Sequence, residues 1–223
     1  MKNKLFFEAL IKFLSGAIIT GALIFGFAGT FDFYNGWLLM GIMFVPMFFA
    51  GLVMLVKNPA LLEKRLKMNE KQKEQKSVVL WSGFVFVLGF AISGLNRRFV
   101  WYTLPESISY AAGVVFLVMY VLYAVVMHQN TYLSRTVEVQ EEQKVIDKGL
   151  YSVVRHPMYA VTIFLFLSVP LVLGSVYAFV VFLMYPFLIS VRIKHEEKYL
   201  EENLEGYKEY KNKVKYRVLP YIW

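Results

Sequence analysis

The feature that most constrains the fold is a series of long, nearly uncharged apolar blocks separated by short polar stretches. Four blocks, at residues 10–31, 37–56, 78–95 and 108–127, are each long enough to cross a hydrocarbon core of roughly 30 Å as a helix. The composition agrees, because 58% of the residues are hydrophobic and the mean hydropathy is +0.51. The sequence therefore predicts an all-α, polytopic integral membrane protein.

A fifth apolar run, residues 158–191, is too long for one span. As a single helix it would measure about 50 Å. Pro170 and the pair Gly174-Ser175 interrupt it near its middle, where they favour a turn. We therefore expect a tight C-terminal helical hairpin, which brings the total to about six transmembrane helices.

The basic residues predict the orientation of these spans. With six spans, all 24 Lys and Arg residues except Arg97 and Arg98 fall on one side of the membrane. By the positive-inside tendency that side is cytoplasmic, and both termini lie there. The same tendency accounts for the net charge of +8, so nucleic acid is not expected as a partner. The basic loop 57–77 is interpreted either as part of this signal or as a patch for anionic lipid headgroups.

The chain is predicted to be a single integral membrane domain over residues 1–223. Residues 1–127 hold four N-terminal spans, and residues 128–223 hold the hairpin and the polar segments beside it. The absence of cysteine excludes thiol nucleophiles and thiolate metal sites. The three histidines, His128, His156 and His195, are too few and too scattered to predict a metal site.

Two polar segments, residues 136–159 and 192–223, flank the hairpin. Because a hairpin returns its two ends to the same face, we expect these segments to meet at the cytoplasmic boundary. In the second segment, Arg192 and Glu196 are four positions apart on a predicted helix. They form either a binding face or a surface ion pair worth well under about 1 kcal/mol. Further along, Tyr207, Tyr210 and Val214 share one face of a short helix, which is typical of an interfacial helix.

Taken together, these segments resemble the isoprenylcysteine carboxyl methyltransferase family and related phospholipid methyltransferases. The resemblance covers roughly residues 136–220, and its pieces are specific only as an ordered set. They are Val139-Gln140, Gly149-Leu150-Tyr151, Arg155-His156-Pro157-Met158-Tyr159, Arg192 with Glu196-Glu197 and Leu200, Gly206-Tyr207 with Tyr210, and Leu219-Pro220.

The resemblance implies a methyltransferase core in residues 128–223 with a cytoplasmic pocket for S-adenosylmethionine. The cofactor-binding residues that it implies are Gln140, Gln143, Lys144, Val145, Ile146, Tyr151, His156, Pro157, Met158, Tyr159, Glu196 and Glu197. It makes Arg192 and Glu196 the catalytic residues, with Arg192 facing the substrate. Two positions depart from the pattern, since eukaryotic relatives have His in place of Gln143 and Leu150 stands where Pro is frequent.

The implied reaction suits the side chains present, since methyl transfer from a sulfonium needs alignment and charge placement more than a protein nucleophile. The acceptor is expected to be lipid-like, and carboxyl O-methylation of an isoprenylcysteine-like substrate is the leading interpretation. Amine N-methylation of a lipid is an alternative. Membrane sterol and steroid reductases, which use NADPH, carry a similar Arg-His-Pro stretch, so a reductase is a second alternative. A non-enzymatic lipid- or partner-binding protein of the same fold is the third.

Overall fold

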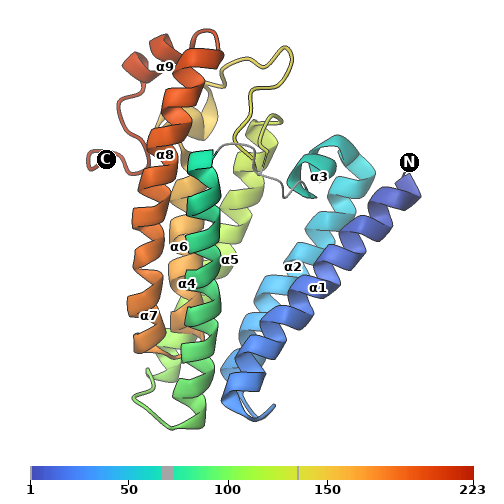
Figure 1. Cartoon of the computed structure of the whole chain (residues 1–223), viewed down its shortest axis with the longest axis vertical. Helices are drawn as coiled ribbons and strands as arrows, with labels where there is room; N and C mark the ends of the chain where they lie inside the picture. Colours follow the sequence, from blue (N-terminus) through green and yellow to red (C-terminus); the bar gives the residue numbers. More distant parts are fainter. Residues whose placement is uncertain (1, 67–72, 135) are drawn as a thin grey trace.

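The computed structural model describes residues 2–66, 73–134 and 136–223, which form a bundle of helices (Figure 1). In chain order the helices are α1 (Lys2–Ala28), α2 (Tyr34–Lys57), α3 (Pro59–Leu66), α4 (Lys73–Arg98), α5 (Glu106–Gln129), the 3-10 helix η1 (Gly149–Ser152), α6 (Pro157–Val172), α7 (Val176–Phe182), α8 (Met184–Asn203) and α9 (Tyr207–Lys213). Among these described residues the β-structure is one isolated bridge between Thr103 and Ser175. The predicted all-α class is confirmed.

Five helices are long and apolar enough to cross a membrane, namely α1, α2, α4, α5 and the combined α7–α8, which runs from Val176 to Asn203. The remaining predicted span, the first arm of the hairpin, is α6, an apolar helix of 16 residues. It is shorter than the roughly 20 residues that a full crossing needs. The structure therefore confirms a multi-pass membrane protein with five helices of spanning length and one shorter helix.

The predicted C-terminal hairpin is present, and its turn is made by Gly174 and Ser175. Gly174 adopts a φ of +74°, a left-handed conformation that favours glycine. The Ser175 hydroxyl then accepts a hydrogen bond from the backbone N–H of Ala178 at 3.3 Å and so caps α7. Pro170 does not end α6, which continues past it to Val172. The interruption at Leu183, between α7 and α8, follows instead from Pro186, which has no N–H to bond the carbonyl of Phe182.

The helices pack around a core at the end of the bundle away from α3 and α9. There α5 packs against α6, while α4 contacts α1, α7 and α8. Gly94 on α4 permits the close approach to α1, because a Cβ at this position would lie 2.6 Å from the Ile24 carbonyl oxygen. From this point α1 and α2 lean away from the other helices towards the end that carries α3 (Figure 1).

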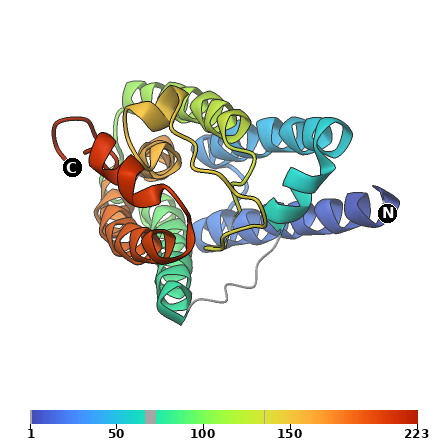
Figure 2. The same ribbon diagram turned by 90° about the horizontal axis from the view of Figure 1, so that it is seen from above.

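The end of the bundle with α3 and α9 also carries the start of α1. The segment that joins α5 to η1 runs across this end, between α3 and the C-terminal helices (Figure 2). Residues 67–72 of the basic loop 57–77 lie outside the described residues, so its role in orientation or lipid binding stays a prediction. Polar segments from the N-terminal half and from the C-terminal half of the chain thus lie at the same end of the bundle.

Candidate active site

A large cavity of about 1110 Å³ lies at the end of the bundle that carries α3 and α9. Its apolar wall comes from α1, α2, α4 and α5, for example from Phe13, Met47 and Phe86. Its polar wall comes from the segment after α5, from the start of α6, and from α8 and α9. Ligand pockets usually measure roughly 300–1,000 Å³, so this cavity has room for more than one reactant.

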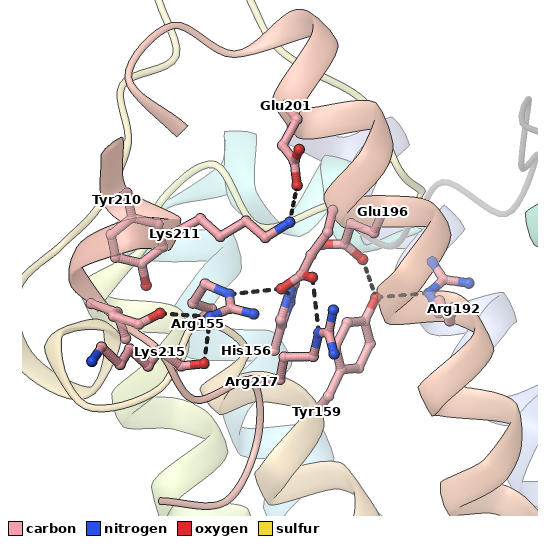
Figure 3. Close-up of polar contacts among 12 residues, drawn as sticks. Arg155, His156, Tyr159, Arg192, Glu196, Glu201, Tyr210, Lys211, Lys215 and Arg217 are labelled. Atoms are coloured by element: carbon pink, nitrogen blue, oxygen red, sulfur yellow. Dashed lines mark hydrogen bonds and ion pairs between the residues drawn. The ribbon is translucent and has the colours of Figure 1, made fainter. Parts of the chain in front are cut away.

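Most of the site residues predicted from the sequence line this cavity. They are Gln143, Lys144, Val145, Ile146, Tyr151, His156, Met158, Tyr159, Arg192 and Glu196. Gln140, Pro157 and Glu197 are not among the lining residues. The hairpin accounts for the gathering, because it brings the start of α6 beside the polar part of α8 (Figure 3).

The Tyr159 hydroxyl bridges Arg192 and Glu196 at the cavity wall. It donates a hydrogen bond to Glu196 Oε2 at 2.5 Å and accepts one from Arg192 Nε at 2.8 Å (Figure 3). A phenol from a different helix therefore contacts both Arg192 and Glu196 and fixes their relative positions. This arrangement places an anionic and a cationic group side by side in the cavity.

Glu197, next in sequence, points into a different environment. Its Oε1 accepts a hydrogen bond from Arg155 Nε at 2.7 Å and lies 3.2 Å from His156 Nε2, while its Oε2 accepts one from Arg217 Nε at 2.9 Å (Figure 3). Only 2% of Glu197 is exposed. It therefore holds together the start of α6, the helix α8 and the tail after α9, rather than facing the cavity.

The tail is fixed to the same place through its backbone. The backbone N–H groups of Arg155 and His156 donate to the carbonyls of Tyr216 and Arg217 at 2.9 and 2.8 Å. The Arg155 guanidinium also donates to the carbonyls of Val214 and Lys215 at 2.6 and 2.8 Å. Pro157 begins α6 at a position where its missing N–H costs nothing, so its role is to start the helix directly after His156.

Gln140 connects the polar segment 136–159 to the N-terminal half of the chain. Its Oε1 accepts a hydrogen bond from Lys64 Nζ on α3 at 2.5 Å, and its Nε2 donates to the Tyr132 carbonyl at 2.7 Å. The backbone N–H of Gln140 donates to the side chain of Gln143 at 3.0 Å. Gln140 thus shapes the turn that carries Gln143 instead of lining the cavity itself.

Several cavity residues were missed by sequence reasoning. Arg65 on α3 hydrogen-bonds the Tyr123 hydroxyl of α5 and lies over the same ring, with its Cζ 5.5 Å from the ring centroid. The sequence offers no signal for this contact, because the residues belong to separate helices 58 positions apart. Tyr207 and Tyr210 were placed on the correct face of α9, but that face packs against the protein with Leu204 and Val214 and is not interfacial.

Burial controls the ionisation of the tyrosines at this end of the cavity. It raises the pKa values of the Tyr151, Tyr207 and Tyr210 hydroxyls above their ordinary value near 10. All three therefore keep their protons at physiological pH and remain hydrogen-bond donors. Within the described residues there is no group of three or more His, Cys, Asp or Glu side chains placed to hold a metal ion.

The matched part of the chain contains most of this site. Residues 111–202 match the model of the isoprenylcysteine carboxyl methyltransferase (ICMT) family. The match begins inside α5, so the resemblance reaches into the fourth predicted span, and it ends before α9. No curated protein matches the chain significantly. The resemblance predicted from the ordered motifs is confirmed: over residues 111–202, this chain carries the sequence pattern of the isoprenylcysteine carboxyl methyltransferase family.

Proposed function

We propose that this protein is an S-adenosylmethionine-dependent methyltransferase that acts on a lipophilic acceptor at the cytoplasmic membrane boundary. The family match implies the coarser activity, a membrane methyltransferase. The observation that carries the finer proposal is the large cavity, in which a polar end and an apolar end are continuous. Such a cavity suits a polar methyl donor that meets a lipid-like acceptor.

The polar end fits the proposed cofactor. The Glu196 carboxylate suits the donor's ammonium and sulfonium charges, and the polar side chains of Gln143 and Lys144 suit its carboxylate and hydroxyl groups. Val145 and Met158 provide apolar surface for a flat base. When bound, S-adenosylmethionine supplies an activated methyl group whose transfer is an in-line displacement.

The protein's part in this reaction is alignment. Tyr159 fixes the Glu196 carboxylate and the Arg192 guanidinium relative to each other, so neither has to reorganise when reactants bind. Arg192 is the group that holds an acceptor carboxylate, because a planar guanidinium matches a carboxylate in a two-point contact. The apolar walls keep bulk water from the reacting atoms, which strengthens both charge interactions.

The charges of the cavity favour an anionic acceptor over a lipid amine. Lys12, Arg65, Lys144, Arg155 and Arg192 line it, against the acidic Glu138 and Glu196, and Arg155 is paired with Glu197 outside the lining. A cationic amine would be repelled by this excess, whereas the carboxylate of a prenylated cysteine would be attracted. We therefore propose carboxyl O-methylation of an isoprenylcysteine-like acceptor. We also propose that the chain is one membrane domain, in which residues 128–223 form the methyltransferase core. Residues 1–127 then supply most of the apolar chamber, the part of the cavity that is lined by α1, α2, α4 and α5.

The test of this function is calorimetric binding of S-adenosylhomocysteine and, separately, of NADPH to the detergent-solubilised protein. We expect saturable binding of the first only. Binding of NADPH alone would favour the reductase, and binding of neither would favour a non-enzymatic role. Transfer of labelled methyl groups to N-acetyl-S-farnesylcysteine, compared with phosphatidylethanolamine, then separates O- from N-methylation.

The apolar chamber gives a second test, through a glycine that lines it. Gly16 on α1 has no neighbouring atom within 4 Å of the position that its Cβ would take. Gly16→Leu should fill part of the chamber and raise the KM for the farnesylated acceptor about fivefold or more, with the Kd for S-adenosylhomocysteine unchanged. Gly26→Leu is the matched control, because Gly26 is on the same helix with equally open space but does not line the cavity. Equal effects of both variants would argue against the chamber as the acceptor site.

A further inference from the structure

The helix α9 lies beyond the matched region, yet it forms part of the cavity wall. Gly206 adopts a φ of +79° directly before Tyr207, so the chain turns sharply after α8 and returns along it. This turn seats Tyr207 against Leu204, Tyr210 and Val214, with Val145 and Leu200 packed beside them. Val145 belongs to the segment for which the family resemblance implies cofactor contacts, so α9 and that segment face each other.

Tyr207 and Tyr210 use their hydroxyl groups differently. The Tyr210 hydroxyl donates a hydrogen bond to the Tyr151 carbonyl at 2.7 Å and so stabilises the fold. The Tyr207 hydroxyl is buried and has no hydrogen-bond partner among the described residues. The two rings are neighbours, with centroids 5.8 Å apart, and both line the cavity. An unsatisfied buried hydroxyl costs free energy, and in a binding cavity that cost is recovered when a ligand supplies the acceptor.

The surroundings of Tyr207 indicate which part of a ligand would accept this hydrogen bond. Val145, Leu200, Leu204 and the two tyrosine rings make an apolar, partly aromatic wall. Such a wall suits the face of a planar heterocycle, while a single phenol donor suits a ring nitrogen or a ribose oxygen at its edge. The carboxylate proposed for the charged amino-acid part of the donor, Glu196, is instead held by Tyr159.

We propose that Tyr207 is a cofactor-binding residue: its ring packs against the adenosine part of the methyl donor and its hydroxyl donates a hydrogen bond to that nucleoside. The inference rests on the proposed function and extends the site beyond the matched region. Because burial raises the pKa of the hydroxyl, the donor proton is present across the physiological range. Tyr207 takes no part in the displacement, so its contribution is to affinity.

The experiment measures the binding of S-adenosylhomocysteine and of 5′-methylthioadenosine, which lacks the amino-acid part, to the full-length protein and to Tyr207→Phe. Loss of one hydrogen bond should weaken binding of both ligands about three- to tenfold. The melting temperature of the unliganded variant should not fall, because its hydroxyl has no partner to lose. Tyr210→Phe is the matched control and should melt at a lower temperature, since it loses the bond to Tyr151.

Three other results would overturn the inference, the proposed function or both. If the wild-type protein binds both ligands and Tyr207→Phe binds them with equal affinity, this inference is overturned while the proposed function stands. A lowered melting temperature for unliganded Tyr207→Phe would show that the hydroxyl serves the fold, and would also overturn the inference. A wild-type protein that binds neither ligand overturns the proposed function and the inference together.

Discussion

Glu197→Ala is expected to lower the free energy of unfolding by about 3–5 kcal/mol, the largest effect of any single change at this site. The carboxylate is buried between Arg155, His156 and Arg217. Removing it leaves the Arg155 guanidinium, whose side chain is only 4% exposed, without its anionic partner. Thermal unfolding in detergent, followed by circular dichroism with S-adenosylhomocysteine absent, measures the loss.

The control for this prediction is Glu201→Ala on the same helix. Glu201 pairs with Lys211, but both side chains are about one-third exposed, so the change should cost less than about 1 kcal/mol. If the two variants unfold at the same temperature, the buried cluster does not hold the tail to the bundle. A larger loss for Glu197→Ala alone identifies Glu197 as a structural residue.

Glu196→Gln, in contrast to Glu197→Ala, should leave the stability of the protein nearly unchanged and weaken the binding of the proposed cofactor. Glutamine can still accept the hydrogen bond from the Tyr159 hydroxyl, so the melting temperature should change little. The negative charge is lost, and a charge-assisted contact worth about 1.5–3 kcal/mol corresponds to at least tenfold weaker binding of S-adenosylhomocysteine. Isothermal titration gives the affinity, and labelled methyl transfer gives the accompanying loss of activity.

Glu202→Gln makes the same change of charge on an exposed part of α8, outside the large cavity. It should bind S-adenosylhomocysteine as the wild-type protein does. Retained affinity in Glu196→Gln would remove Glu196 from the cofactor site. A further comparison uses 5′-methylthioadenosine, whose binding should be insensitive to Glu196→Gln because it has no ammonium group.

The spans and the C-terminal hairpin could be predicted because membrane insertion acts on local sequence. A long apolar block is sufficient to predict a helix, and Pro170 with Gly174-Ser175 near the middle of an overlong block predicts a turn. The meeting of residues 136–159 with residues 192–223 then follows from the hairpin alone. The contacts of Tyr159 with Glu196 and of His156 with Glu197 are its result.

The different environments of Glu196 and Glu197 could not be predicted. Adjacent residues on a helix point about 100° apart, so only one of them can face a given cavity. Which one does so depends on how α8 is rotated against α6, and that rotation is set by packing. Tyr207 and Tyr210 pose the same difficulty, since they share a face and differ only in whether the Tyr151 carbonyl is within reach.

The contribution of α3 was also beyond the sequence. Lys64 reaches Gln140, and Arg65 reaches Tyr123, across 76 and 58 positions. Each is one basic residue among many in the loop 57–77, so composition alone cannot separate a site contact from a topology signal.

The outward lean of α1 and α2 gives the two ends of the cavity wall different structural supports. The polar end is braced by the buried cluster around Glu197, which ties α6, α8 and the tail together. The chamber wall on α1 and α2 meets the other helices mainly at the far end of the bundle, where the core lies. Under the proposed function, substitutions along the open part of α1 and α2 should therefore reshape the space for the acceptor while the cluster around Glu197 stays intact. In engineering terms, acceptor preference then becomes a property that can be varied separately from the proposed methyl-donor site.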